Sequence, residues 1–303
     1  MKDFEKQEKA FENEIADRYN DDYHTSIIMK EHDNDFARYV SRVVTENDRV
    51  LDLGCGPASL WKLWTKELPK CQRLVGVDLS DEMIKIAKKN WPDNEFFSSS
   101  IFDLPFESGS FDVVIVSSVL HHIPDENLNE VFKEIFRVLD EHGKVVGREP
   151  VGINTLSNKS GWFSGAIMHL RHLIFRLTNT REYPEPDIGE YHHAYDPEVF
   201  FNALSSLFLI KGIEFKYPFS DYVTRCNDEN VFKIVKYLDD IIKKNGQEFY
   251  YSAHKNFSDV DDVKFCVEQV IKEITKFIMN SKLMLIFRQQ QKLSIIYGKN
   301  NIR

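Results

Sequence analysis

Two acidic residues bracket a glycine-rich turn in the first half of the chain. Asp52 lies in the apolar run 50–53, and Gly54 and Gly56 follow it. Glycine lets a backbone turn tightly and approach a ligand where a Cβ would clash. A second apolar run, residues 74–77, ends at Asp78, whose carboxylate could accept both hydroxyls of a ribose. The order strand, glycine turn, helix, strand and acid is typical of a nucleoside site in an open α/β sheet.

The residues in this turn distinguish between two classes of nucleoside cofactor. A dinucleotide fingerprint needs a third glycine three residues after Gly56, and Ser59 stands at that position. Asp52 would repel a pyrophosphate, but it would suit a ligand that carries an ammonium group. The pattern therefore favours an aminoacyl nucleoside over NAD.

These residues carry a family resemblance. Asp52, the glycine turn and Asp78 resemble motifs I and II of the class I S-adenosylmethionine (SAM)-dependent methyltransferases. The blocks Leu-Pro-Phe…Ser-Phe-Asp at 104–112 and Leu-His-His-Ile at 120–123 are similar to the small-molecule branch, which includes quinone-biosynthesis-type, methyltransferase-11-like enzymes. The resemblance implies an α/β, Rossmann-like fold. It has a seven-stranded, mostly parallel sheet of order 3-2-1-4-5-7-6, an antiparallel last strand and a helical cap built from insertions.

The resemblance also implies a cofactor, SAM, and its product, S-adenosylhomocysteine (SAH). Asp78 would hold the ribose diol, and Asp52 with the glycine turn would face the methionine moiety. The family has an acid four residues before Leu104, where this chain has Ser100, so either Ser100 or Asp103 would contact the adenine. The expected cofactor-binding residues are Asp52, Gly54, Cys55, Gly56, Asp78, Leu79, Met83, Ser100, Ile101, Phe102, Ser117, His122 and Tyr19.

Additions surround the expected SAM-binding core at 47–150. Residues 1–46 look helical and would form a lid, in which Tyr19 or Tyr23 closes the site or packs on the sheet. Residues 151–190 predict an amphipathic cap helix that covers the substrate, packs on the core or lies on a membrane surface. Residues 191–217 predict a core helix and strand six, 218–290 a helical insertion, and 291–303 the last strand.

The expected chemistry narrows the search for catalytic residues. An in-line displacement at the methyl group needs no covalent enzyme nucleophile, but a protonated acceptor needs a base. His192 and His193, where the cap returns to the core, and Glu149, after strand five, are the candidates. His122 could serve as a base, contact SAM or be structural. No metal site is expected, because further ligands would be needed beside the cap histidines.

The composition of the chain narrows the classes of partner and the cellular compartment that are expected. The formal charge is −9, and no basic cluster resembles a nucleic-acid groove. The four cysteines are widely spaced, which is typical of a reducing compartment. The first residues are charged and do not contain the apolar segment of a signal peptide. No apolar stretch is long enough for stable insertion into a membrane, so a cytoplasmic protein is expected. The composition does not indicate an oligomeric state.

Together these features predict a SAM-dependent methyltransferase. The acceptor would be an O, N or C atom of a small or medium-sized, cyclic or hydrophobic metabolite. Three alternatives stay open: a SAM-binding regulator without activity, a nucleotide-dependent oxidoreductase, and a methyltransferase with a protein or nucleic-acid acceptor.

Overall fold

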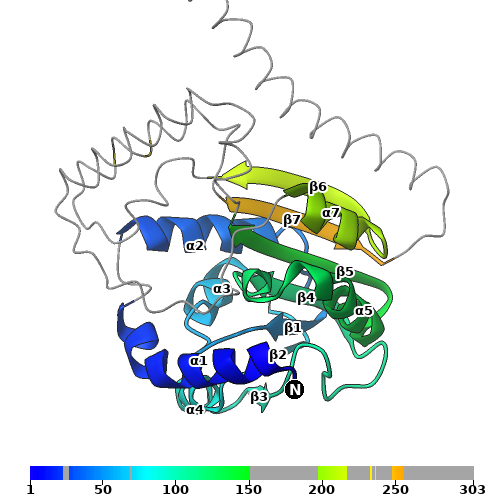
Figure 1. The fold of residues 1–303 in the computed structure, drawn as a ribbon. Helices are drawn as coiled ribbons and strands as arrows, with labels where there is room; N and C mark the ends of the chain where they lie inside the picture. Colours follow the sequence, from blue (N-terminus) through cyan, green and yellow to red (C-terminus); the bar gives the residue numbers. More distant parts are fainter. Residues whose placement is uncertain are drawn as a thin grey trace, which may run out of the picture.

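A mixed β-sheet forms the centre of the computed structural model, which describes residues 1–22, 27–68, 70–150, 197–216, 233, 236 and 248–255. Its strands are β1 (Arg49–Leu53), β2 (Arg73–Asp78), β3 (Glu95–Ser98), β4 (Phe111–Ser117), β5 (Leu139–Pro150), β6 (Leu209–Lys216) and β7 (Glu248–His254). The order in the seven-stranded sheet is β3-β2-β1-β4-β5-β7-β6 (Figure 1). Strands β1 to β5 pair in parallel, and β7 is antiparallel to both β5 and β6. The fold predicted from the family resemblance is confirmed in this order and in its antiparallel strand.

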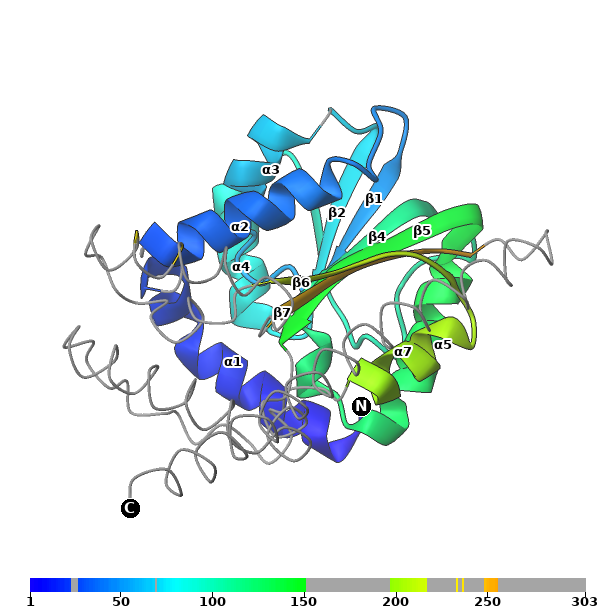
Figure 2. The same ribbon diagram turned by 90° about the horizontal axis from the view of Figure 1, so that it is seen from above.

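Helices cover both faces of the sheet. They are α1 (Asp3–Asp22), α2 (Ile27–Val40), α3 (Trp61–Glu67), α4 (Asp81–Asn90), α5 (Leu128–Val138) and α7 (Pro197–Ser205), with short 3-10 turns η1 (Leu120–His122) and η2 (Asp125–Asn127). Figure 2 shows α2, α3 and α4 on one side of the sheet and α5 and α7 on the other. No described helix combines the length and the apolar character that a membrane span needs.

The central strands are buried on both faces, as parallel strands in α/β folds are. Successive side chains of a strand point to opposite faces. Val113 and Ile115 of β4 therefore belong to the apolar cluster under α2, α3 and α4, whereas Val114 and Val116 belong to the cluster under α5 and α7. The sheet is held between two separate cores.

The last strand of the sheet lies earlier in the chain than the sequence predicted. Strand β7 fills the place between β5 and β6 and lies inside the range 218–290, which was expected to be a helical insertion. Tyr250 and Tyr251 are fully buried and belong to opposite clusters, which suits aromatic residues in a strand with two covered faces. Residues 151–190 and 291–303 lie outside the described residues, and so does the expected cap.

Helix α1 lies across the carboxyl ends of the parallel strands. It contacts the turn after β2 through Lys9 and Asp81, whose Nζ and Oδ2 are 2.9 Å apart. It also contacts the turn after β3 at Ser100 and the turn after β4 at His122. Ligands of open α/β sheets bind at this edge, so α1 covers the place where a ligand is expected.

Candidate functional site

The turn after β1 brings the backbone close to two neighbours. Gly54 and Gly56 have φ values of +72° and +51°, which glycine adopts without strain. A Cβ on Gly54 would lie 2.2 Å from Cγ2 of Val119, so this glycine allows the turn to approach the loop after β4. A Cβ on Gly56 would meet no heavy atom within 4 Å. The backbone at Gly56 therefore faces open space that a ligand can enter.

Asp78 ends β2 directly beside this turn. Its Oδ2 accepts a hydrogen bond from the Gly56 N–H, and its Oδ1 accepts one from the Ser80 N–H, both at 2.8 Å. Burial raises the pKa of Asp78, while these two hydrogen bonds oppose the rise. The Leu79 N–H also acts on this carboxylate. Because an ionised carboxylate has about four lone-pair sites, at least one acceptor site remains, and Asp78 can accept a hydroxyl of a diol while it holds the turn.

Asp52 lies deeper than the ligand-facing position that the motif predicted. Its side chain is 3% exposed, and its Oδ2 accepts a hydrogen bond from Trp61 Nε1 at 2.7 Å. Burial, together with the nearby charge of Asp78, raises the pKa of Asp52 to about 7, and the hydrogen bond from Trp61 opposes the rise. Sequence reasoning missed Trp61, the first residue of α3. The hydrogen bond ties α3 to β1 below the glycine turn.

The turn after β3 contacts α1. The Ser100 hydroxyl accepts a hydrogen bond from the Phe102 N–H at 3.1 Å and donates one to Glu5 of α1. The ring of Phe4 packs edge-on against Phe102, with the centroids 5.9 Å apart. Asp103, the alternative adenine contact, is exposed. Ser100 is therefore the one of these two residues that faces the covered edge of the sheet.

Glu149 braces the turn after β4. Its buried carboxylate accepts hydrogen bonds from three successive backbone N–H groups, those of Val119 (3.0 Å), Leu120 (2.9 Å) and His121 (3.2 Å). Burial raises the pKa of Glu149 to about 7, and these hydrogen bonds oppose the rise. The contacts favour a role in shaping η1 over the role of a base.

An acidic face of α1 lies over η1, and sequence reasoning missed it. Glu8 Oε1 is 2.8 Å from Nδ1 of His122, and Glu12 forms a hydrogen bond with Glu8. Burial raises the pKa of Glu12 to about 8; the charge of His122 opposes the rise, and Asp78 and Glu8 add to it. Burial acts to lower the pKa of His122, but the neighbouring acids raise it overall. The sequence does contain a pattern that could have revealed this acidic face. Glu5, Glu8 and Glu12 are three and four residues apart, which places them on one face of a helix.

A buried ion pair stands at the ends of β4 and β5. Arg148 donates to Ser117 Oγ through Nε at 2.9 Å and to Asp33 Oδ1 through Nη2 at 2.7 Å. Arg148 and Asp33 are 4% and 1% exposed. Arg148 thus joins α2, through Asp33, to the end of β4, where it holds the Ser117 hydroxyl.

The remaining predicted residues divide into three groups. Met83 is buried, and Leu79, Ile101 and Cys55 are half-buried near the strand ends. Tyr19 lies half-buried on α1. Tyr23, His192 and His193 lie outside the described residues, so the two candidate bases stay a prediction.

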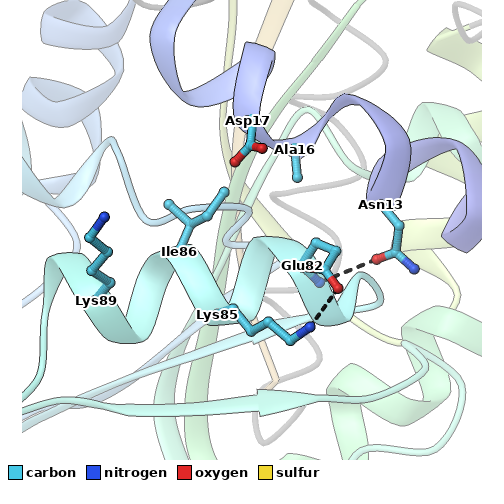
Figure 3. A pocket seen from close by; sticks show the side chains of 7 residues that line it. All are labelled: Asn13, Ala16, Asp17, Glu82, Lys85, Ile86 and Lys89. Atoms are coloured by element: carbon cyan, nitrogen blue, oxygen red, sulfur yellow. Dashed lines mark hydrogen bonds and ion pairs between the residues drawn. The ribbon is translucent and has the colours of Figure 1, made fainter.

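A small hollow lies where α1 crosses α4. Its volume is about 180 Å³, and Figure 3 shows the side chains that line it: Asn13, Ala16, Asp17, Glu82, Lys85, Ile86 and Lys89. Ligand pockets usually measure about 300–1,000 Å³ and are mostly apolar. This hollow is therefore a seam between the two helices and does not match a cofactor site.

Comparison with known proteins identifies the central part of the chain. The family described as "Methyltransferase domain" matches residues 51–147. Residues 51–147 form a class I methyltransferase domain. This methyltransferase domain contains the glycine turn, Asp78 and both loops that contact α1. Class I methyltransferases take their methyl group from SAM, so the family supports the cofactor that the motifs predicted.

Two curated relatives resemble the methyltransferase domain and its flanks. A demethylmenaquinone methyltransferase of Lactococcus lactis is 35% identical over 144 residues, which are 44% of this chain and 54% of that protein. A malonyl-[acyl-carrier protein] O-methyltransferase of Legionella pneumophila is 38% identical over 101 residues, 31% of this chain and 34% of that protein. The chain thus spans about half the length of the first relative and about a third of the second.

Solved structures share the fold. A geranyl diphosphate methyltransferase in complex with SAM superposes with a TM-score of 0.51 at 15% identity, over 75% of this chain and 86% of that one. The [4+2]-cyclase SpnF superposes with a TM-score of 0.50 at 15% identity, over 77% and 84%. At these identities the likeness shows the fold alone, and a fold hosts several chemistries.

Proposed function

We propose that the chain transfers the methyl group of SAM to an O, N or C atom of a small or medium-sized metabolite, cyclic or hydrophobic in character. One observation carries the proposal: Asp78 and the open side of Gly56 meet at the carboxyl ends of β1 and β2, within the methyltransferase domain. An acid with free lone pairs beside an accessible backbone suits the ribose and the methionine moiety of SAM.

The residues around this point fit the rest of the cofactor. Ser100 and Phe102 offer a hydroxyl and an aromatic ring at the end of β3, where the adenine is expected. Glu12 lies close enough to Asp78 and His122 for their charges to act on it, and Asp78 likewise acts on Asp52. A ligand with positive charge would favour the ionised form of these carboxyl groups. SAM, when bound, supplies a methyl group on a positively charged sulfonium.

In this reaction the residues of the protein would orient the acceptor toward the methyl group, exclude water and remove a proton from the acceptor. Orientation and desolvation can contribute about 7–11 kcal/mol to such a displacement. Glu149 holds η1 in place, and α1 covers the edge from the water side. His193 and His192 are the first candidates for a base toward a protonated acceptor, and His122 is the second because it lies at the end of β4.

One alternative has a specific observation in its favour. The fold is shared with the structure of a [4+2]-cyclase, so a protein with this architecture need not transfer a methyl group. The chain would then bind SAM and SAH without turnover. A nucleic-acid acceptor is less favoured, because the net charge of −9 opposes contact with phosphates.

Calorimetric titration with SAH, with NAD as the control, tests the proposal first. We expect SAH to bind and NAD not to bind. Methyl transfer from SAM is then measured by mass spectrometry with demethylmenaquinone and a malonyl thioester, the acceptors for which the two relatives are named. Binding of NAD without SAH would contradict the proposal. Binding of SAH without transfer to any acceptor in a wider screen would support the non-catalytic alternative.

A further inference from the structure

Three metal-ligating side chains converge between α1 and η1. Glu8 and Glu12 come from α1, and His122 comes from the turn after β4. Each offers one ligand atom, and the three atoms all lie within 4.8 Å of one another. Glu8 Oε1 and His122 Nδ1 are 2.8 Å apart.

These separations suit a single metal ion. Ligand atoms that lie about 2.1 Å from an ion are about 3 Å apart at neighbouring octahedral positions and about 4.2 Å apart at opposite ones. The 2.8 Å separation of Glu8 and His122 is close to the neighbouring value, and the 4.8 Å limit on the whole set is a little above the opposite one. Glu8 and Glu12 are four residues apart on one helical face, a spacing that metal sites on helices use.

Contacts outside the cluster hold α1 in this place. Lys9 pairs with Asp81 at 2.9 Å. The Asn13 side-chain oxygen accepts hydrogen bonds from Ser80 Oγ at 2.7 Å and from the Glu82 N–H at 3.2 Å (Figure 3 shows the latter). Lys9 lies between the two acids in the helix, and Asn13 directly follows Glu12. The packing of α1 on α4 therefore brings the acids over η1 and does not depend on their own interactions.

The cluster brings several carboxyl groups together. Glu8 and Asp78 lie close enough to Glu12 to act on it, and His122 is a basic group that acts on Glu12 as well. The side chains of Glu8 and His122 are only 22% and 21% exposed, so water screens the group weakly. Carboxylates brought together out of water need a cation or protons to compensate them.

We propose that Glu8, Glu12 and His122 bind a divalent cation and that this cation fastens α1 over the end of β4. Two carboxylate oxygens and one imidazole nitrogen suit ions that accept mixed ligation, Mn²⁺ or Zn²⁺. Three protein ligands leave coordination positions for water or for a further oxygen. If the proposed function holds, an oxygen of the acceptor can bind there, beside the expected methyl group.

Metal titration of the full chain tests the site without cofactor or acceptor. Mn²⁺ is added to EDTA-treated, dialysed protein, and free Mn²⁺ is measured by electron paramagnetic resonance; Zn²⁺ is titrated by calorimetry. We expect one site, and we expect Glu12→Gln to weaken it at least about tenfold because a ligand is lost. Glu14→Gln removes the same charge from the exposed side of α1 and should leave affinity unchanged. Glu8→Gln is the second test variant if Glu12→Gln does not fold.

A second readout addresses the fastening of α1. Amide hydrogen exchange in residues 3–22 should slow at least about threefold when Mn²⁺ is added to the wild type, and not in Glu12→Gln. Absence of binding by both ions near millimolar concentration would overturn the proposal, and so would equal affinity of Glu12→Gln and the wild type. Because SAH binding is measured separately, a protein that binds SAH and no metal refutes this inference and leaves the proposed function intact.

Discussion

Glu149 Oε2 and His121 Nδ1 lie 2.9 Å apart, in a hydrogen bond that joins the end of β5 to η1. Both groups are buried. The two oxygens of this carboxylate also accept three backbone N–H groups, so the acid acts as the organising centre of the turn that carries His122. The residue that the sequence suggested as a base therefore determines where other residues of the site stand.

Replacing Glu149 with Gln should loosen this turn. The amide group would place an N–H donor against backbone donors, and a buried donor without an acceptor costs about 1–3 kcal/mol. We expect urea unfolding to show a loss of this size, together with weaker SAH binding. Glu141→Gln, at an exposed position of β5, should change neither quantity. If Glu149→Gln were as stable as the wild type, the bracing role would be wrong.

Substitution of the glycines should separate backbone strain from contact with a ligand. Gly54, Gly56 and Gly109 all have positive φ, so alanine costs about 1–2 kcal/mol at each through strain. At Gly54 the methyl group would also clash with Val119, and this variant should be the least stable. Gly56→Ala should fold but lose SAH affinity, because its methyl group would occupy the open space in which the ligand is expected. Gly109→Ala, far from the turn, should bind SAH normally; equal binding by Gly56→Ala would argue against a ligand at the turn.

Asp78→Asn should weaken SAH and SAM binding while keeping the shape of the side chain. A hydrogen bond to a charged group contributes about 1.5–3 kcal/mol, which corresponds to roughly tenfold to a hundredfold in the dissociation constant. Calorimetry measures this change directly. Asp93→Asn removes an exposed acid from the same half of the chain and serves as the control. An unchanged dissociation constant in Asp78→Asn would exclude the ribose contact.

Much of the domain follows from features that a sequence displays directly. Apolar runs that end at Gly54 and at Asp78 predict buried strands with a ligand-facing turn, and the structure has β1 and β2 there. Strand β7 was missed because apolar residues at helical spacing further along 218–290 suggested one helical insertion. The run around Tyr250 and Tyr251 is rich in strand-forming aromatics, but only pairing with β5 and β6 decides between the two forms.

The partners of the buried polar residues could not be predicted in the same way. The spacing of Glu8 and Glu12 shows that they share a helical face, but not that this face meets His122. Likewise, Asp33 and Arg148 are far apart in the chain and pair only because α2 packs near the end of β5. Such contacts depend on how elements dock, which local sequence patterns do not encode.

Removing Asp33 should be costly because it leaves Arg148 charged and buried. Loss of one partner of a buried ion pair costs about 3–5 kcal/mol, so we expect Asp33→Ala to lower the free energy of unfolding by that order. The double variant Asp33→Ala, Arg148→Met should recover part of the loss, since no buried charge remains. Glu95→Ala breaks the exposed pair with Arg73 and should cost about 1 kcal/mol or less. If Asp33→Ala cost no more than Glu95→Ala, water would have to reach Arg148.

Three acids at the site share a pKa pattern that links stability to pH. Burial raises the pKa of Glu12 to about 8 and the pKa values of Asp52 and Glu149 to about 7. The folded chain therefore holds these protons more tightly than the unfolded chain does. Their contribution to stability is complete below the ordinary carboxyl pKa and is lost as pH rises through about 7 to 8. His32 behaves in the opposite way. Burial, aided by the charge of Arg148, lowers its pKa to about 3. Its contribution to stability is therefore present above the ordinary histidine pKa of about 6.5 and is lost as the pH falls below that value.

The free energy of unfolding should therefore fall between about pH 7 and 8, a range in which His32 is mostly neutral in both states. Each acid contributes a slope of up to about 1.4 kcal/mol per pH unit. Glu12→Gln removes one of these protons, so its curve should be flatter over this range than that of the wild type, whereas Glu14→Gln should follow the wild type. Urea unfolding at several pH values, in EDTA to exclude bound metal, measures these slopes. Equal slopes for Glu12→Gln and the wild type would mean that Glu12 is already ionised at neutral pH, with α1 standing further from Asp78 and His122 than the structure shows.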